Sequence, residues 1–548
     1  MGTSDLDEKR SSAESVRDNE KSEKHTSAHG IAVSVTEVDT GAALVAGDHG
    51  ELDPAEAARV LRKIDIHILP LMCVLYWIQF MDKTTLGSSA ILGIQCVASY
   101  HTLLAPYTDH RKATHLTTNQ YNWLGTVFYL SYLAFEFPQN LALQRFPVAK
   151  WMSINIFIWA VALCSHAACT NFAGLLVARL VLGMCEGSIT AGFLLVSSMF
   201  YTRTEQTLRV GYWFLMNGTA QIITGFVSFG SLHIHTARFE PWQWLMIITG
   251  ALTLVTAALF WFLFPDSPTD AWFLTPPERA VAVLRLKVNQ TGVENKHFKK
   301  EQMIEALLDP KTWLFALFSA LDNVPNSLTN QRQIIESSFG FSVLQTTLLG
   351  CVDGAVEIVT IWTGTKISAR TGSRAWVAVI YSVPNILGTI LVTTLPWSDK
   401  VGLLFSVWIT GVGTTGFVIA LSWLSAVTAG HTKRVTTNAI MLGAYCIGNA
   451  AGPFMWQARY KPRNHVPWTV IGVCYGCCML TLLAIRALLV AENRRRDAAQ
   501  ATAEPDPWDD VYVERRAQDG SGRMERVKVD KEYLDLTDRQ NRDFRYVY

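Results

Sequence analysis

The chain has 548 residues, of which 50% are hydrophobic and only 17% are charged. Soluble domains carry about 25% charged residues, so this composition argues against an ordinary soluble enzyme. The formal net charge is +1, which gives no sign of the basic surface that binds nucleic acid. Most of the ten cysteines lie in apolar stretches. Even the cluster of Cys474, Cys477 and Cys478 has no His or Asp beside it, so we expect these cysteines to pack in the interior rather than bind metal.

Apolar stretches of about 20 residues recur along the chain, and each is long enough to cross about 30 Å of hydrocarbon. We predict twelve transmembrane helices, at 66–90, 120–142, 151–170, 173–200, 208–232, 244–264, 312–332, 343–366, 375–395, 401–428, 435–456 and 467–490. The predicted organisation is a disordered cytoplasmic tail (1–60), a first six-helix half (61–264), a cytoplasmic central loop (265–311), a second six-helix half (312–490) and a cytoplasmic tail (491–548). The fold class is therefore an all-α membrane protein with two pseudo-symmetric halves.

Basic residues in the short loops set the orientation in the membrane. With a cytoplasmic N-terminus, the inner loops hold Arg145, Lys150, Arg203, Arg209, Lys366, Arg370, Arg374, Lys433 and Arg434. The outer loops hold fewer basic residues, with Arg459, Lys461 and Arg463 as a local exception. We therefore predict that both termini are cytoplasmic and that the protein lies in the plasma membrane, since no retention signal is evident.

Charged residues inside the predicted helices are the first candidates for a functional site. A charge at mid-bilayer costs about 2.5–3.5 kcal/mol even on insertion scales, so these residues must face protein or a water-filled path. Arg179 and Glu186 lie seven residues apart, on nearly one face of a helix. An Arg suits a carboxylate ligand and a neighbouring acid suits proton exchange, whereas the alternative is a structural ion pair.

Adjacent residues in a helix point about 100° apart, so Asp82 and Lys83 cannot satisfy each other. Lys83 is a candidate second cation for an anionic substrate, and Asp82 is a candidate for proton coupling or for a structural pair. Glu136 is a further proton-coupling candidate, with a gate or packing contact as the alternative. Asp353 and Glu357 lie four residues apart on one face and are specificity candidates; the alternatives are solvation in a cavity and pairing to Arg332.

The seventh predicted span carries an unusual set of polar residues beside a proline. Asp322, Asn326 and Asn330 flank Pro325, which interrupts the helical hydrogen bonds. We predict a hinged helix that lines a cavity, with both asparagines binding substrate and Asp322 tuning specificity. Asn449, between small residues, is a weaker substrate-binding candidate, and close packing of helices is its alternative.

The loops after the second span of each half resemble each other, which indicates related halves meeting around a midplane site. Residues 141–150 and 364–374 both carry basic residues at matching distances. This repeat resembles the Gly-x-x-x-Asp-Arg-x-Gly-Arg-Lys motif of the major facilitator superfamily, although Gln144 and Ala369 replace the Asp.

More specifically, the chain resembles the fungal allantoate permease family of anion:cation symporters from about Arg62 to Arg496. The segments that carry the resemblance are Asp82–Leu86, Asn119–Gly125, Phe135–Asn140, Asn171–Arg179, Tyr201–Gln206, Pro265–Pro268, Glu294–Phe298, Asn438–Ile440 and Gly448–Pro453. Relatives pass through a shorter link where this chain has residues 95–113, which are either an outer loop or a retained intron of the gene. The resemblance implies anion symport with an Arg and an acid on one span.

These observations predict a secondary transporter that carries a small organic anion, or a related nitrogenous or vitamin-like solute, together with protons. Its partners would be that substrate, protons and the lipid bilayer, with no nucleic acid, and we expect a monomer. The sequence has no phosphate-binding loop, zinc motif or nucleophile triad, so we expect no catalysis and no cofactor. Two alternatives remain: export of a metabolite by the same fold, and a nutrient sensor that binds without transporting.

Overall fold

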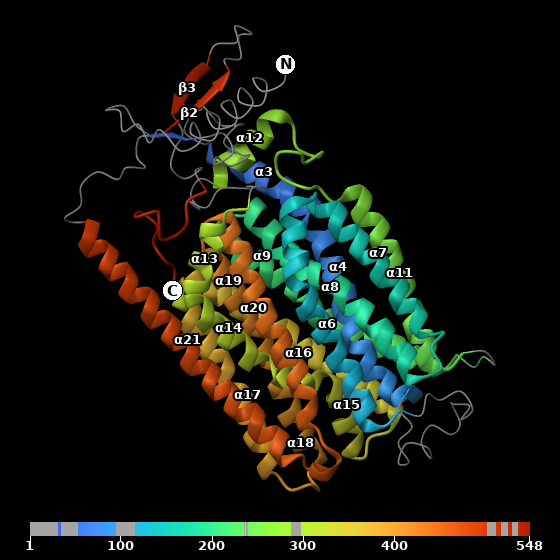
Figure 1. The fold of residues 1–548 in the computed structure, drawn as a ribbon. Helices are drawn as coiled ribbons and strands as arrows, with labels where there is room; N and C mark the ends of the chain where they lie inside the picture. The colour runs from blue at the N-terminus through green and yellow to red at the C-terminus, as the bar shows by residue number, and fades with distance from the viewer. Residues whose placement is uncertain are drawn as a thin grey trace, which may run out of the picture.

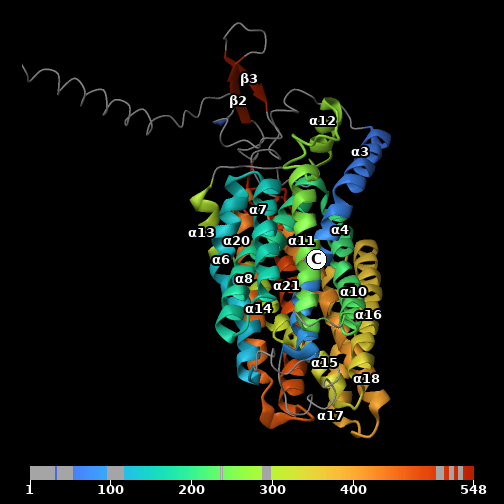
Figure 2. The same cartoon turned by 90° about the vertical axis from the view of Figure 1, so that its right-hand side faces the viewer.

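The computed structural model describes residues 31–33, 53–94, 116–234, 236, 239–286, 298–500, 511–516, 524–528 and 535–548. Within these ranges the chain forms an elongated bundle of long helices that run side by side (Figures 1 and 2). We call the end that carries α3 and α12 the tail end, and the end that carries α15 and α18 the far end. The predicted loop 95–113 lies outside the described residues.

The first half of the bundle contains six long helical segments. They are α3–α4 (Pro54–His67 and Leu69–Ser89, continued by the π-helical η2, Ala90–Ile94), α6 (Thr118–Arg145), α7 (Val148–His166), α8 (Phe172–Phe200), α9–α10 (Arg203–Phe214 and Met216–Ser231) and α11 (Pro241–Leu263). Two shorter helices follow at the tail end, α12 (Pro276–Arg285) and α13 (Lys300–Leu308).

The second half repeats this arrangement with six more segments. They are α14–η4–α15 (Pro310–Asn323, Pro325–Ser327 and Leu328–Ser338), α16 (Val343–Thr371), α17 (Arg374–Thr394), α18–η5–α19 (Lys400–Ile409, Thr410–Gly413 and Thr414–Ala426), α20–η6 (His431–Ala451 and Gly452–Met455) and α21 (His465–Gln500). A short 3-10 turn, η7 (Ala458–Tyr460), precedes α21. These segments lie where the sequence predicts the twelve spans.

Local sequence explains where the helices begin and end. At α16, the Ser342 hydroxyl accepts from the Gln345 backbone N–H while the Gln345 side chain accepts from the Ser342 N–H, which satisfies two free donors of the first turn. The helix ends at Gly372, whose φ of 67° is a left-handed conformation that glycine adopts without strain. Lys366 and Arg370 therefore lie in the last turns of α16 rather than in a loop.

The helices at both ends of the chain are longer than the predicted spans. The first segment begins at Pro54, capped by Asp53, and the last helix continues to Gln500. The sequence boundaries at 60 and 491 therefore fall inside helices. The difference arises because polar helical turns outside the hydrocarbon give no hydropathy signal.

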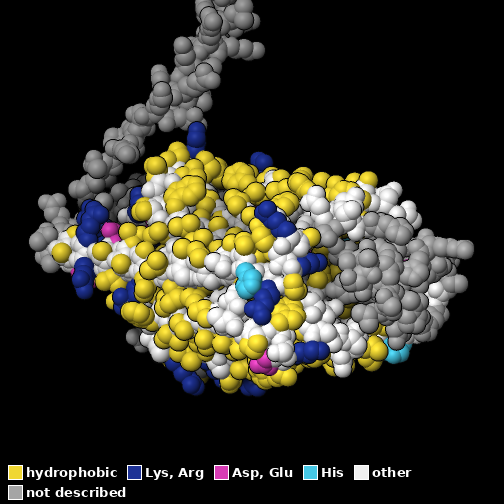
Figure 3. Space-filling view, turned by 90° about the horizontal axis from the view of Figure 1, so that it is seen from below, with side chains coloured by type: hydrophobic (Ala, Val, Ile, Leu, Met, Phe, Trp, Pro, Cys, Tyr) yellow, Lys and Arg dark blue, Asp and Glu magenta, His cyan; other side chains and the backbone are white. Residues whose placement is uncertain are grey.

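The lateral surface of the bundle is apolar. In the part of the chain that the structure describes, eight helical stretches are long and apolar enough by themselves to span a membrane. Large hydrophobic side chains point outward, with Phe262 78% and Leu480 69% exposed. Figure 3 shows hydrophobic side chains over much of the surface seen from below, with scattered Lys and Arg. In water such a surface would be unstable, whereas lipid satisfies it.

The other four segments, which contain α6, α10, α14–α15 and α20, are divided into shorter helices or are less apolar, and they lie where the halves meet. α6 packs along α20 and α10 packs along α16. Toward the far end, the Tyr121 hydroxyl donates to the Asn330 carbonyl at 3.4 Å. Toward the tail end, Arg434 donates to the Ser198 hydroxyl at 3.0 Å. The halves therefore touch on both sides of the middle of the bundle.

The α10–α16 crossing depends on two glycines whose backbones are in contact. A Cβ on Gly354 would lie 2.4 Å from the Gly218 carbonyl oxygen, and a Cβ on Gly218 would lie 2.3 Å from that of Gly354. We expect Gly354→Ala to force the halves apart and to lower both thermal stability and transport. Melting of the purified protein tests this, with Gly476→Ala as control, because a Cβ there meets nothing within 4 Å. A variant as stable and active as the parent would contradict it.

Segments from both ends of the chain lie at the tail end. Three short strands, β1 (Ile31–Val33), β2 (Val511–Arg516) and β3 (Met524–Lys528), form a sheet in the order β1-β2-β3. β1 pairs parallel to β2, and β2 pairs antiparallel to β3. Both views place β2 and β3 beyond the bundle, near α12 (Figures 1 and 2). The sheet thus joins the sequence before the first helix to the sequence after the last.

Candidate functional site

A cavity lies between the two halves near the middle of the bundle. Its volume is about 1340 Å³, counting space open to solvent. Its lining comes from α4, α6, α8, α9, α10, the α14–α15 region, α16, η5–α19, α20 and α21. Five charged residues line it: Lys83, Asp322, Arg332, Asp353 and Glu357.

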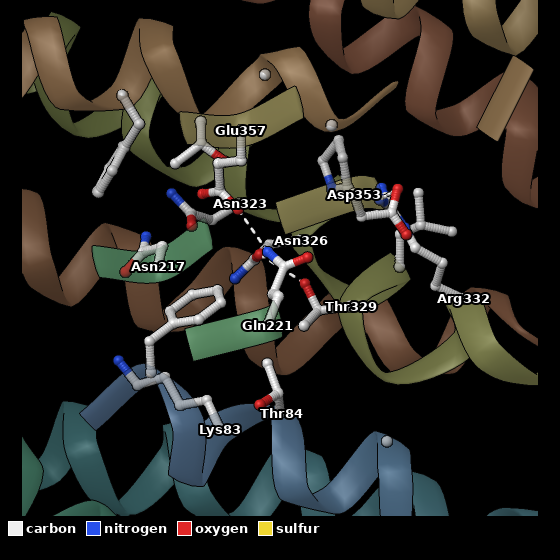
Figure 4. Close-up of a pocket in the computed structure, with 18 of the residues that line it drawn as sticks. Lys83, Thr84, Asn217, Gln221, Asn323, Asn326, Thr329, Arg332, Asp353 and Glu357 are labelled. Atoms are coloured by element: carbon white, nitrogen blue, oxygen red, sulfur yellow. Dashed lines mark hydrogen bonds and ion pairs between the residues drawn. The ribbon is translucent and has the colours of Figure 1, made fainter. Parts of the chain in front are cut away.

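Lys83 presents the cation on the wall of the first half. Its Nζ lies 3.7 Å from Oε2 of Glu186, whose side chain is fully buried behind it on α8. It also lies 5.9 Å from the centre of the Tyr445 ring. The Lys83 side chain is 12% exposed, and Figure 4 shows it extending from α4 toward the cavity. A solute in the cavity can therefore reach this ammonium group, but not Glu186 directly.

Arg179 and Asp82 lie deeper than Lys83. Arg179 is 3% exposed and Asp82 is fully buried, and neither is among the lining residues. Both interact electrostatically with Glu186. Arg179 and Glu186 share a helix face, as their spacing predicts, but the ion pair within 4 Å in the described residues joins Glu186 to Lys83. The structure therefore brings the four predicted residues together as one buried group with Lys83 at its surface.

Glu136 is buried apart from the cavity. It lies on α6, 2% exposed, and its Oε1 accepts from the Asn140 side chain at 2.7 Å. Oε2 has no hydrogen-bond partner among the described residues and lies 3.6 Å from where a Cβ of Gly187 would be. This position beside α8 fits a packing contact as well as proton coupling.

The wall of the second half carries the predicted specificity pair. Arg332 forms an ion pair with Asp353 and donates to the Thr410 hydroxyl at 3.5 Å. Pairing with Arg332 was one alternative for Asp353, and the structure shows it. Glu357 instead accepts from the Gln221 side chain of α10 at 2.5 Å, as the dashed line in Figure 4 shows. Glu357 therefore links the two halves at the cavity.

The seventh segment is interrupted at the proline, as the sequence predicts. α14 ends at Asn323 and α15 begins at Leu328. Asn326 donates to Asn449 at 2.7 Å, and Asn449 donates to Asn323 at 3.1 Å. Asn326 and Asp322 line the cavity, whereas Asn330 lies at the far-end contact between the halves and Asn449 supports Asn326 from behind.

Several lining residues were missed by reasoning from sequence. Asn217 and Gln221 face the cavity from α10 together with Thr224, and Tyr475 faces it from α21. Asn217 and Gln221 are four residues apart in an apolar span, so their spacing could have placed them on one face. Tyr475 gives no such signal, because buried tyrosines are common in helix cores.

A second cluster of buried charges lies at the tail end, and the sequence analysis did not foresee it. The C-terminal strap, residues 535–548, inserts Asp538 beside α14 and α20. Asp538 forms ion pairs with Lys311 and, at 2.7 Å, with Lys433, and it accepts from the Tyr546 hydroxyl at 2.7 Å. Burial opposes ionisation of Asp538, but the two lysines outweigh it and hold its pKa well below the usual range.

The fold and the cavity define a membrane transporter built from two helical halves, and sequence comparison shows which family it belongs to. The pattern of the Major Facilitator Superfamily matches residues 72–453, so the chain belongs to that superfamily of multi-pass membrane transporters. Within it, the chain falls among fungal transporters related to allantoate permease.

Three of the relatives are transporters of Saccharomyces cerevisiae. A thiamine pathway transporter is 34% identical, covering 92% of this chain and 88% of its own length. An allantoate permease is 30% identical over a match that covers 90% of this chain and 87% of the permease. A high affinity cysteine transporter is 29% identical over a match that covers 81% of this chain and 82% of that transporter. Allantoate and cysteine are chemically different solutes, so membership of the family establishes transport of a small molecule without identifying that molecule.

Solved structures support the fold alone. The xylose transporter XylE from E. coli, in a partially occluded inward open conformation, is similar with a TM-score of 0.55 and 12% identity, covering 78% of this chain and 98% of its own. XylE bound to 6-bromo-6-deoxy-D-glucose gives a TM-score of 0.56 at 12% identity, and the match covers 78% of this chain and 96% of XylE.

Proposed function

We propose that this transporter is a proton-coupled symporter of a small organic anion, or of a related nitrogenous or vitamin-like solute. It would act as a monomer in the plasma membrane with the tail end in the cytoplasm. The observation that carries the proposal is the pairing of Lys83, which lines the cavity, with Glu186, which is fully buried behind it.

This pair gives a physical route to coupling. A solute anion entering the cavity competes with Glu186 for the Lys83 ammonium group. When Lys83 turns to the solute, the buried carboxylate loses its compensating charge, and a buried uncompensated charge is costly. Uptake of a proton by Glu186 relieves that cost. Binding of the anion and of the proton thus favour each other, as a symporter requires.

The remaining buried charges have supporting roles in this proposal. Arg179 lies behind Glu186 and Asp82 and offsets their negative charge, while Asp82 is a second place for the proton. The interrupted α14–α15 segment, held by Asn326 and Asn449, lets the second half move against the first around the solute.

Uptake measurements at two pH values test the proposal. Cells lacking their own permeases would be offered allantoate, ureidosuccinate, nicotinate, biotin, pantothenate, thiamine and small dipeptides at pH 5 and pH 7.5. We expect one of them to be taken up faster at pH 5. With Glu186→Gln we expect the acid stimulation to disappear, because the glutamine cannot exchange a proton, while exchange of labelled for unlabelled solute continues.

The control is Glu301→Gln, which neutralises an exposed acid on α13 and should leave the pH dependence unchanged. Acid stimulation that survives Glu186→Gln would contradict the role of Glu186. If protein shown to reach the cell surface takes up none of the solutes, release from preloaded cells is measured next. Release there would replace uptake with export as the direction of transport.

A further inference from the structure

Three buried carboxyl groups surround one guanidinium group on the wall of the second half. Arg332 on α15 forms an ion pair with Asp353. It also interacts electrostatically with Glu336, about one turn further along the same helix, and with Glu357 on α16. Glu336 is fully buried, Asp353 is 1% exposed and Glu357 is 3% exposed. A guanidinium group carries a single positive charge, so it can balance only one of the three acids.

Glu357 has neutral hydrogen-bond donors of its own. The Gln221 side chain donates to its Oε2 at 2.5 Å, and the carboxyl group also forms hydrogen bonds with Thr414 and Asn217. Hydrogen bonds of this kind favour the ionised form of a carboxyl group. The charge of Glu357 is therefore supported by groups other than Arg332.

Glu336 and Asp353 face each other instead of a donor. Neither oxygen of Glu336, nor Oδ2 of Asp353, accepts from an N–H or hydroxyl group in the described part of the chain. The two carboxyl groups instead lie in hydrogen-bond contact with each other. An ionised carboxyl group can only accept, so this contact needs a proton on one of them. One shared proton also removes the repulsion between two buried carboxylates.

No second basic side chain forms an ion pair with either acid in the described ranges. Lys83 of α4, which packs on α15, forms its ion pair within the first half. α10 and α19, which pack on α16, contain no charged residue, and Lys400 of α18 is exposed at the far end. The other titratable neighbours are Glu357 and Cys351 on α16, and Tyr475 of α21 interacts with the guanidinium group.

A metal ion between the two acids would meet the positive charge of Arg332, whereas a proton fits inside their contact. We propose that Glu336 and Asp353 share one proton and form a proton-binding site in the second half. Asp353 and Arg332 line the cavity, where Figure 4 shows them beside each other, so solvent entering the cavity can exchange this proton. The inference goes beyond the proposed function, which places protons on Glu186 and Asp82 of the first half.

Infrared spectra of the purified full-length protein test the site without any solute, because a protonated carboxyl group has a carbonyl band that a carboxylate lacks. We expect Glu336→Gln to remove one protonated carboxyl group at pH 7, since Asp353 is then ionised against Arg332. Asp353→Asn should also remove one, because Glu336 then ionises against the same guanidinium group. The double variant should remove no more than either single variant, which distinguishes one shared proton from two separate ones.

Transfer of the parent protein to D2O tests whether the proton exchanges through the cavity. The band that Glu336→Gln removes should shift to its deuterated position while the protein stays folded. A band that does not shift would show a sealed proton and would overturn the proton-binding site. A parent melting temperature that rises in NaCl relative to choline chloride, with no such rise in Glu336→Gln, would assign the pair to a metal cation and would also overturn it.

Glu301→Gln is the control, because it neutralises an exposed acid of α13 and should leave the protonated band unchanged. The band removed by Glu336→Gln should be present in a Glu186→Gln background as well, so the two proton sites are tested separately. A band that persists in Glu336→Gln, or that only one of the two single substitutions removes, contradicts the shared proton. A parent protein without a protonated carboxyl band at pH 7 overturns the site by itself, so a variant that does not fold cannot obscure the result.

Discussion

Replacing Lys83 with glutamine is expected to lower solute uptake about 100-fold. Lys83 is the cation on the first wall of the cavity, and in the described structure Arg332, the other basic lining residue, is held by Asp353. Removing one member of a desolvated charge pair costs about 2–5 kcal/mol, and about 2.7 kcal/mol corresponds to a 100-fold change in affinity. Initial uptake rates, corrected for protein at the cell surface, measure the effect.

The same substitution should also destabilise the protein. Without Lys83, Glu186 remains fully buried and loses the cation within 4 Å, a change that costs about 3–5 kcal/mol for buried pairs. The loss should be smaller at pH 5, where a proton can neutralise the carboxylate. The double variant Lys83→Gln with Glu186→Gln should recover the melting temperature but not the uptake, because the buried charge is gone while the solute still lacks its cation.

Lys400→Gln is the matched control, since Lys400 is exposed at the start of α18, at the far end. It should leave uptake and melting unchanged. Normal transport by a stable Lys83→Gln variant would show that the anionic group of the solute binds elsewhere, and would contradict the coupling between Lys83 and Glu186.

Replacing Asp538 with alanine should lower the free energy of unfolding by about 3 kcal/mol. In Asp538→Ala, Lys311 keeps only Asp309, at 3.2 Å, which it shares with Lys433 at 3.1 Å. Two buried lysines then compete for one aspartate, with Glu305 reaching only Lys433. The cost lies near the lower end of the 3–5 kcal/mol range for broken buried pairs, because some compensation remains. Thermal unfolding and proteolysis of residues 535–548 would report it.

The loss of stability caused by Asp538→Ala should be the same at pH 8 and at pH 5. The pKa of Asp538 is depressed in the folded protein, so its stabilisation is fully present above the unfolded pKa of about 3.9 and is lost only as pH falls through the lower folded pKa. Asp497→Ala is the control, because the ion pair of Asp497 with Arg545 is exposed and such pairs contribute about 1 kcal/mol or less. Equal effects of the two variants would contradict a buried cluster.

The sequence predicted the helices well because hydrophobicity governs them directly. Apolar runs located the spans, and Pro325 marked the interruption between α14 and α15, since both signals are local. Prediction from the sequence missed the tail-end helices and the buried position of Asp538, whose partner Lys311 lies 227 residues away. A contact of that length leaves no periodicity in the sequence, although the charged residues that form it are visible.

The site was predicted only in part, because spacing along one helix is a local signal and packing between helices is not. Spacing placed Arg179 and Glu186 on one face of α8, but only packing of α4 decides that Lys83, not Arg179, borders the cavity. Similarly, Asp353 could have faced water or Arg332, and the choice depends on how α15 lies against α16. Helical spacing identifies the face of a residue, whereas its depth depends on neighbours that are distant in sequence.

The C-terminal strap has a consequence for the synthesis of this protein. Asp538 lies 227 residues after Lys311 in the chain, so the ribosome releases it much later than this lysine. All the predicted membrane spans precede it, and Lys311 and Lys433 are in place before the acid that pairs with both. The bundle therefore remains locally incomplete until the segment that carries Asp538 has been made. A product that stopped before Asp538 would carry an under-compensated pair of buried lysines, Lys311 and Lys433, even though every predicted span is present.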